Sequence, residues 1–196
     1  MRPRTRSTRT LRLATAAATI GALLVLPLAT AASAASPTVP VGTYPDGVAV
    51  NPSTNTIYVT NQNDRTVSVI NGSTNAVATT IQGGSGLVAV AVNPSTNTVY
   101  VANYFDNSVS VINGSTNTVT ATVQVGRNPS AVAVNPSTNT VYVANESDNL
   151  VSVINGSNNA VTSTVQVGSK PSAVAVNPST NTVYVANLSG NSVSVI

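Results

Sequence analysis

Side chains able to carry acid–base or nucleophilic chemistry are scarce in this chain of 196 residues. It has no histidine and no cysteine, and the closest pair among its five acidic residues is Glu146 and Asp148. Without an imidazole or a thiol, the sequence excludes a Ser-His-Asp triad, a Cys-His pair and the familiar zinc ligand sets. The two neighbouring carboxylates are either an acid–base pair or part of a solvated polar turn. We expect no catalytic residue, no metal and no cofactor.

Two other segments resemble ligand sites only in part. The oxygen-rich run from Asn145 to Asn149 suits calcium by residue type, but calcium prefers about six to eight oxygens and several carboxylates. The run Gly83-Gly84-Ser85-Gly86 lacks the lysine and the helix that follow a phosphate-binding loop, which favours a flexible connection. Three Asn-Gly-Ser sequences match glycosylation sites, although turn geometry also explains them: Asn71, Asn113 and Asn155.

Residues suited to recognition are easier to find than residues suited to catalysis. Tyr104 and Phe105 are the only adjacent aromatic residues of the chain, and Asp106 follows them. Large rings beside charged groups are typical anchors for a protein partner or a sugar ring. The elements that carry these side chains decide whether they face solvent.

An internal repeat organises those elements. The block Asn-Pro-Ser-Thr-Asn-Thr begins at Asn51, Asn93, Asn135 and Asn177, so successive copies lie 42 residues apart without insertion or deletion. A period of about 40 to 45 residues is typical of one four-stranded propeller blade. We therefore predict an all-β fold, a β-propeller of four-stranded antiparallel blades near residues 45–84, 87–126, 129–168 and 171–196.

Each repeat contains four predicted strands. In the third copy they are Ala131–Val134, Thr140–Ala144, Leu150–Ile154 and Val161–Val167, because apolar residues alternate there and Val, Ile, Thr and Tyr are enriched. Asn155-Gly156 marks the last turn, where these residue types tolerate left-handed backbone angles. A further strand, equivalent to the fourth strand of a blade, is expected at 38–42, before the first blade. One tyrosine recurs on every second strand, which indicates packing: Tyr58, Tyr100, Tyr142 and Tyr184.

The connections between strands differ in how much they vary. The first-to-second and third-to-fourth connections barely change, whereas the second-to-third ones read NQNDR, NYFDN, NESDN and NLSGN, and the fourth-to-first ones also vary. Alternate connections of a meander lie at the same end of the sheet, so the variable ones share a face. Drift in unconstrained turns would produce the same pattern. We predict a binding surface there, formed by Tyr44, Asp46, Asp64, Arg65, Tyr104, Phe105, Asp106, Arg127, Glu146, Asp148 and Lys170.

Residues 1–34 are predicted to be a signal peptide, and residues 35–196 the repeat domain. Five arginines precede an apolar stretch at 13–28, and Ala32-Ser33-Ala34 provides small residues for cleavage. A transmembrane anchor is the alternative, but Pro27 and polar residues interrupt the stretch. Cleavage leaves three basic and five acidic residues, which changes the formal charge from +3 to −2. The mature chain thus offers no support for nucleic-acid binding and no stable membrane span.

A family resemblance rests on the segment Tyr58-Val59-Thr60-Asn61 and its three Tyr-Val-Ala-Asn copies. These residues resemble the YVTN β-propeller repeat family of secreted and surface-layer proteins, and the resemblance extends over residues 38–196. It implies a propeller, usually of seven blades, that is similar to propellers with lactonase, lyase or redox activity. A lyase of that type would be expected to use histidine, which this chain lacks.

The sequence allows three ways of closing the propeller. Residues 38–42 align with 122–126 and Ile196 aligns with Ile112, so the N-terminal strand can complete the C-terminal blade. Four blades would meet at roughly 90° and need bulky side chains between them, whereas Val, Ala, Ser and Thr suit seven or eight blades at about 45 to 51°. Three arrangements are possible: part of a longer propeller, a homodimer that closes eight blades, or a strained ring of four.

The function that these observations favour is that of a secreted, non-catalytic binding or cell-surface structural module, surface-layer-like in character. An unidentified protein or a cell-wall glycan would contact the variable connections. The rival interpretation is a propeller enzyme of lactonase or lyase type. Convergent carboxylates in the central channel would favour the enzyme, and a channel lined by Ala, Val and Ser would favour the module.

Export can be tested by the mass of the secreted protein. If Ala32-Ser33-Ala34 is the cleavage site, the protein should begin at Ala35 and lack all five leading arginines, because signal peptidase removes the leader. Intact-mass spectrometry of the secreted fraction measures this. Recovery of the chain from Met1 onward in a membrane extract would establish an anchor instead.

Overall fold

The computed structural model describes residues 36–196, and the predicted signal peptide lies outside them. The described residues form strands joined by turns, with no helix among them. No helix within this part of the chain is long and apolar enough to cross a membrane. The predicted all-β fold is confirmed.

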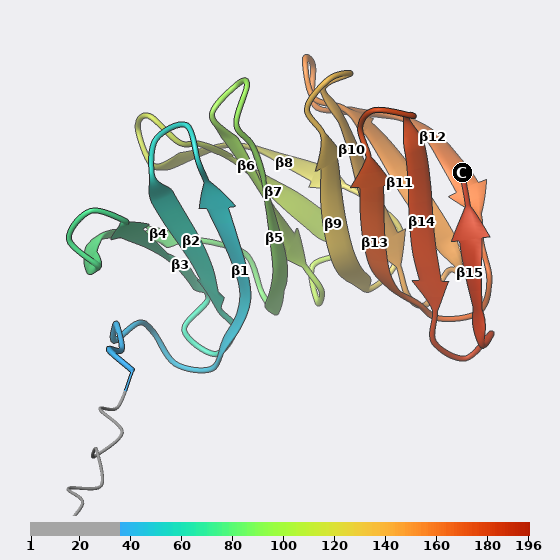
Figure 1. The fold of residues 1–196 in the computed structure, drawn as a ribbon. Coiled ribbons are helices and arrows are strands. Elements are labelled where there is room, and N and C mark those ends of the chain that lie inside the picture. The colour runs from blue at the N-terminus through green and yellow to red at the C-terminus, as the bar shows by residue number, and fades with distance from the viewer. Residues whose placement is uncertain (1–35) are drawn as a thin grey trace, which may run out of the picture. The chain divides into compact units, whose positions relative to one another are not determined.

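Four antiparallel sheets follow one another along the chain, and in each of them sequential strands pair (Figure 1). We call them blades 1 to 4. Blade 1 comprises β1 (Pro45–Asn51), β2 (Thr56–Asn61), β3 (Thr66–Asn71) and β4 (Ala76–Gln82). Blade 2 comprises β5 (Leu87–Asn93), β6 (Thr98–Asn103), β7 (Ser108–Asn113) and β8 (Thr118–Gln124). Blade 3 comprises β9 (Pro129–Asn135), β10 (Thr140–Asn145), β11 (Leu150–Asn155) and β12 (Ala160–Gln166), and blade 4 comprises β13 (Pro171–Asn177), β14 (Thr182–Asn187) and β15 (Ser192–Val195).

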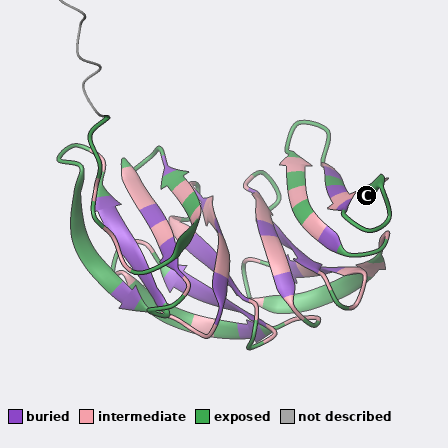
Figure 2. Cartoon of the chain, turned by 90° about the horizontal axis from the view of Figure 1, so that it is seen from below, coloured by how far each residue is buried: buried purple, intermediate pink, exposed green. Residues whose placement is uncertain are grey.

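The blades fan out from their first strands. β1, β5, β9 and β13 lie against one another, whereas the fourth strands β4, β8 and β12 of neighbouring blades scarcely touch. The fourth strands are also mostly exposed, as the green outer ribbons in Figure 2 show. Close inner strands and splayed outer strands are the geometry of propeller blades, so the predicted architecture is confirmed.

Small aliphatic side chains fill the space between blades. At the first junction, Tyr58, Val67 and Val69 of blade 1 pack against Val90 and Val99 of blade 2. Equivalent clusters join blade 2 to blade 3 and blade 3 to blade 4. Tyr58, Tyr100 and Tyr142 thus have the packing role that their repetition indicated, whereas Tyr184 in blade 4 is 44% exposed.

The turns share one backbone device, and one detail of the prediction was wrong. Every turn holds a single residue with positive φ, between 44° and 69°, and most of these residues are Asn. In the turn after β11 this residue is Asn159, not Asn155 or Gly156. Gly156 is needed there for a different reason, because a Cβ at this position would collide with Oδ1 of Asn139. The left-handed position thus comes at the end of the turn, where Asn tolerates αL angles.

Buried asparagines brace each blade internally. The Asn that ends the second strand directs its amide onto serine or threonine side chains of the third strand. In blade 2, Nδ2 of Asn103 donates to Oγ of Ser108 at 3.0 Å and to Oγ of Ser110 at 2.9 Å. Asn61, Asn145 and Asn187 occupy the same place in the other blades. This amide therefore ties the second strand to the third from inside the turn.

A second set of asparagines links neighbouring blades. Nδ2 of Asn51 donates to Oδ1 of Asn97 at 2.7 Å, so the end of the first strand in blade 1 is joined to the following turn of blade 2. The same bond, at 2.8 and 2.7 Å, recurs between Asn93 and Asn139 and between Asn135 and Asn181. Each inter-blade junction is therefore polar at one end and apolar along its length.

The strand predicted at 38–42 was wrong, and the described chain does not close a four-bladed ring. Residues 36–41 have no regular structure and residues 42–44 form a bend. β15 pairs only with β14, so blade 4 has three strands. Blades 1 and 4 lie at opposite ends of the row (Figure 1), which leaves residues 38–42 without a neighbouring third strand to pair with.

The buried amide of Asn103 provides a test of this architecture. Asn103→Ala should lower the free energy of unfolding by about 2 kcal/mol or more, because two buried hydroxyl groups lose their donor. Gln124→Ala is the control, since Gln124 is exposed at the end of β8, and should change stability by less than about 0.5 kcal/mol. Urea unfolding measures both. Equal stability of the two variants would contradict a bracing role.

Candidate binding face

Backbone hydrogen bonds bring the two variable sets of connections together. Tyr104 N donates to Gly86 O at 2.8 Å, and Glu146 N donates to Asn128 O at 3.0 Å. Corresponding bonds join the loops of blades 1 and 4. The second-to-third turns thus lie beside the fourth-to-first loops. We call this surface the variable face, and it comprises residues 43–46, 62–65, 83–86, 104–107, 125–128, 146–149, 167–170 and 188–191.

Three of the predicted acidic residues hold this face together. An Oδ2 atom of Asp64 accepts the backbone N–H of Thr43 at 2.6 Å. Asp106 and Asp148 make the same bond to the N–H groups of Ser85 and Arg127, at 2.7 and 2.6 Å. Blade 4 carries Gly190 at the equivalent position. Because the bond recurs at one repeat position, these carboxylates orient the fourth-to-first loops.

Arg127 is held twice by the same carboxylate. Besides the backbone bond, its Nε atom lies 2.6 Å from Oδ1 of Asp148. These contacts hold the pKa of Asp148 below its ordinary value, the backbone N–H of Arg127 contributing most. The guanidinium is largely exposed while the carboxylate is mostly covered. Arg127 therefore presents donors to solvent from a restrained position.

The aromatic pair spans the junction between blades 2 and 3. The rings of Tyr104 and Phe105 meet edge to face, with centroids 5.3 Å apart and planes at 88°. Tyr104 OH donates to Oε2 of Glu146, at the same repeat position in the next blade, at 3.2 Å. Burial raises the pKa of Tyr104, and the negative charge and hydrogen bond of Glu146 raise it further. Tyr104 is thereby fixed between the two blades.

Phe105 projects into solvent from this fixed base. Its side chain is 65% exposed. The ring rests on the glycine-rich loop, since a Cβ on Gly86 would lie 2.5 Å from Cδ2 of Phe105. Gly86 also has a φ of +69°, so its lack of a side chain serves both the turn and the ring. The segment predicted to be a flexible connection is thus the support of an exposed aromatic ring.

The structure groups some predicted residues and separates others. Tyr104, Phe105, Arg127, Glu146 and Asp148 lie in adjoining loops of blades 2 and 3, and we call them the aromatic patch. Two further residues, Asn128 and Ser147, connect them, with Asn128 Nδ2 donating to Tyr104 O at 3.3 Å and Ser147 Oγ to Asn128 Oδ1 at 2.7 Å. The sequence does not distinguish Asn128 from the other turn asparagines. The remaining predicted residues lie elsewhere on the variable face: Tyr44, Asp46, Asp64 and Arg65 in or just before blade 1, Asp106 next to Phe105 in blade 2, and Lys170 just before blade 4.

The carboxylates of Glu146 and Asp148 in blade 3 do not converge on a common site, because each has a different partner. Glu146 accepts a hydrogen bond from Tyr104, whereas Asp148 faces Arg127. The amide of Asn145 turns inward to Ser152. Within residues 36–196, no three His, Cys, Asp or Glu side chains gather to hold a metal ion. The innermost strands β1, β5, β9 and β13 carry a single acidic residue, Asp46.

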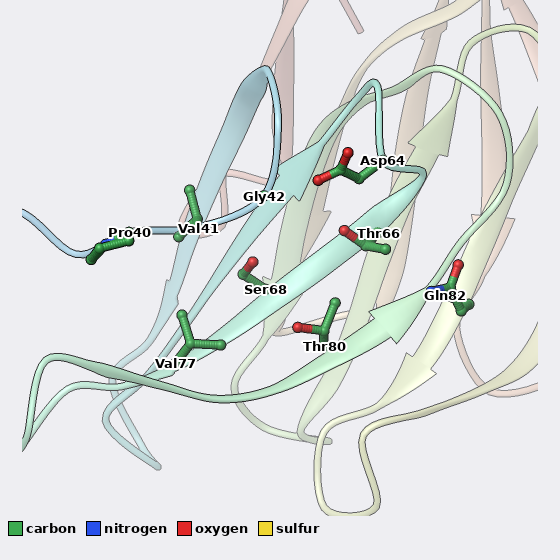
Figure 3. Close-up of a pocket in the computed structure, with 9 residues that line it drawn as sticks. All are labelled: Pro40, Val41, Gly42, Asp64, Thr66, Ser68, Val77, Thr80 and Gln82. Atoms are coloured by element: carbon green, nitrogen blue, oxygen red, sulfur yellow. The ribbon is translucent and has the colours of Figure 1, made fainter.

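A hollow in blade 1 belongs to the repeat and not to this patch. It measures about 560 Å³ and lies between residues 40–42 and strands β3 and β4 (Figure 3). Asp64, Thr66 and Ser68 line it. The equivalent hollow of blade 2, of about 250 Å³, is lined by Asp106, Ser108 and Ser110. Both hollows lie beside an aspartate that holds a fourth-to-first loop, and the hollow of blade 1 has the larger volume.

Comparison with known proteins agrees with the fold. A family model described as "Lactonase, 7-bladed beta-propeller" matches residues 113–196, which is less than half of the chain. Among solved structures, Kuenenia stuttgartiensis hydrazine synthase aligns with a TM-score of 0.72 and 24% identity, covering 79% of this chain and 46% of that one. A functionally unknown protein from Desulfotomaculum acetoxidans DSM 771 aligns with a TM-score of 0.67 and 17% identity, covering 78% and 55%. The chain spans about half the length of these structures, and no curated protein matches it. These comparisons thus support the β-propeller fold and do not identify a particular reaction.

The bonds to Asp148 predict a pH-dependent contribution to stability. Because the pKa of Asp148 is lowered by folding, its contribution is complete above the unfolded value of about 3.9 and is lost as the pH falls through the folded value. At pH 7, Asp148→Asn should cost about 0.5 to 1.5 kcal/mol, the usual worth of one such bond. The gap between variant and parent should shrink at pH 3. Urea unfolding at both pH values measures this, with exposed Asp46→Asn as the control that changes little at either.

Proposed function

We propose that this protein is an exported, non-catalytic β-propeller module that binds a cell-wall glycan through the aromatic patch. The observation that carries the proposal is the exposure of Phe105 beside residues that are held by hydrogen bonds. Sixty-five per cent of this side chain faces solvent, although folding favours covering apolar area. Its equivalents in the other blades are Asn63, Ser147 and Ser189. The fold of the repeat therefore does not require a ring here.

The neighbouring groups suit a sugar. A ring face offers the apolar surface on which a pyranose stacks, and polar groups around it can bind hydroxyls. Glu146 supplies acceptors, the exposed guanidinium of Arg127 supplies donors, and Ser147 has a hydroxyl at the same edge. These groups are held by bonds to Tyr104, Asp148 and Asn128. Little side-chain freedom would be lost on binding, which favours affinity.

The export role rests on the sequence. The predicted leader of residues 1–34 and the similarity to YVTN repeats of secreted and surface-layer proteins support a location outside the cell. A protein partner in place of a glycan is the second occupant that the same patch could take, since aromatic residues and Arg also anchor protein interfaces. The binding experiment below separates the two.

A lactonase-type enzyme is the competing function, and the family match over residues 113–196 favours it. Against it, the chain has no histidine, and Asp64, Asp106 and Asp148 each accept a backbone N–H. The single inner acid, Asp46, has no second carboxylate on the innermost strands. These features support binding in preference to hydrolysis.

Substitution of the exposed ring tests the binding proposal. Phe105→Ser should weaken binding to purified cell-wall glycan at least tenfold, about 1.4 kcal/mol, and the double variant Tyr104→Ser/Phe105→Ser at least as much. Thermal stability of the single variant should change by less than about 0.5 kcal/mol, because Phe105 is exposed. Isothermal titration and a melting curve measure the two quantities.

Controls come from the opposite face. Ser137→Ala and Ser179→Ala lie in invariant first-to-second turns and should bind like the parent. Equal glycan binding by Phe105→Ser and the parent would refute the proposed site. Binding of a surface protein but not of glycan, lost in Phe105→Ser, would assign the patch to a protein partner. Hydrolysis of a lactone that Asp46→Asn abolishes would establish the enzyme instead.

A further inference from the structure

An asparagine bond joins consecutive blades on the variable face. Oδ1 of Asn107 accepts the backbone N–H of Asn128 at 2.9 Å, at the junction of blades 2 and 3. Oδ1 of Asn149 accepts the backbone N–H of Lys170 at 2.8 Å, at the junction of blades 3 and 4. Each bond ties a second-to-third turn to the loop that enters the next blade.

The junction between blades 1 and 2 cannot make this bond. Arg65 and Gly86 occupy the two positions there, and an arginine side chain carries donors only. Gly86 is buried, and its N–H group has no hydrogen-bond partner within residues 36–196. Burying a donor without an acceptor costs free energy. The loop therefore holds an N–H group that a ligand can satisfy.

Arg65 shares the backbone conformation of the asparagines that make the bond. Its φ is 56°, compared with 53° for Asn107. Gly83 N donates to Arg65 O at 2.9 Å, as Val125 N donates to Asn107 O at 3.0 Å. The side chain of Arg65 therefore leaves the backbone in the direction of the Gly86 N–H group. It is exposed and makes no ion pair in the described part of the chain.

The fold of the repeat explains neither replacement. A positive φ is common for Asn and uncommon for Arg, so Arg65 costs conformational free energy as well as a hydrogen bond. Unfavourable backbone angles tend to be found at functional sites. The exposed ring of Phe105 covers the same loop, because its Cδ2 atom lies where a Cβ of Gly86 would be. The unsatisfied N–H group and the exposed ring thus belong to one place on the variable face.

We propose that the glycan bound by the aromatic patch is acidic, and that one of its carboxylates binds between the guanidinium of Arg65 and the N–H group of Gly86. This inference rests on the proposed function, because a sugar ring on Phe105 brings the carboxylate to this loop. A carboxylate accepts a backbone N–H bond and also matches the planar fork of a guanidinium. It supplies the acceptor that asparagine supplies at the other two junctions.

The charges around this junction make Arg65 decisive for an anion. The two flanking turns, residues 62–65 and 104–107, carry the carboxylates of Asp64 and Asp106, which each accept a backbone N–H at 2.6 and 2.7 Å. Arg65 is the one basic residue of these turns. Without it both turns would be negative and would repel a carboxylate. A neutral sugar would be indifferent to that change.

Arg65→Asn tests the site with and without ligand. The substitution gives Gly86 its acceptor and places a residue suited to positive φ, so the melting temperature of the free protein should rise by about 2 to 4 °C. Binding to purified cell-wall glycan should weaken at least tenfold, because the charge is gone and Asn occupies the N–H group. Calorimetry measures both quantities. Lys170→Asn, which also replaces a cation by Asn at a positive φ but outside the aromatic patch, is the matched control and should weaken binding less than twofold.

Chemical reduction of the glycan separates its acidic group from its sugar rings. Conversion of the carboxylates to alcohols with carbodiimide and borohydride should weaken binding by the parent at least tenfold and leave binding by Arg65→Asn unchanged. In the amide NMR spectrum, the intact glycan should shift the Gly86 N–H resonance downfield in the parent and not in Arg65→Asn.

The outcomes distinguish this inference from the proposed function. Equal binding of intact and reduced glycan, lost in Phe105→Ser, would overturn the acidic ligand and leave the glycan site standing. Glycan binding that Phe105→Ser does not weaken would overturn the proposed function itself. A melting temperature that Arg65→Asn fails to raise would overturn the inference as well, because the side chain at this position would then not reach Gly86.

Discussion

Each blade in this protein is a thin sheet that must cover one face with its neighbour, and the rest of the structure depends on this requirement. The side chains available for the task are mostly valine and alanine, with one tyrosine per blade. Such small groups allow close, narrow-angled stacking, so no blade can bury itself alone. The effect is visible in Tyr184, which has the same local sequence as Tyr100 and yet is exposed, because no other blade within residues 36–196 covers it.

Polar bonds give this apolar stack its order. The asparagine pairs between blades, such as Asn51 with Asn97, align successive repeats. The Asn103 type of amide braces the second-to-third turn, and aspartates such as Asp106 tie the neighbouring loop. Because buried polar groups are costly without partners, these residues recur in every complete blade or nearly so. The residues that differ between blades are those whose side chains do not take part in these hydrogen bonds.

The aromatic patch is formed by such variable residues in two adjacent blades, blades 2 and 3. Tyr104 and Glu146 occupy the same repeat position in successive blades. They can bond across the blades because one is a hydroxyl donor and the other a carboxylate acceptor. Phe105 needs a loop without side chains beneath it, which Gly86 supplies. The propeller fold is shared with proteins such as hydrazine synthase at low identity, and shared folds host unrelated functions. The particular chemistry of this chain therefore resides in such local differences between blades.

The sequence alone predicts the architecture of the blades, because strand alternation, turn residues and period are local properties repeated four times. The strands of the third copy were predicted to within two residues of their observed ends. It also located the variable connections that contain the patch. Tertiary structure decided what local patterns do not contain: that Asp64, Asp106 and Asp148 serve loops, that Asn159 and not Asn155-Gly156 takes the left-handed turn position, and that residues 38–42 stay unpaired. These outcomes depend on which segments meet in space, and segments with the same local sequence, such as those around Tyr100 and Tyr184, differ only in their neighbours.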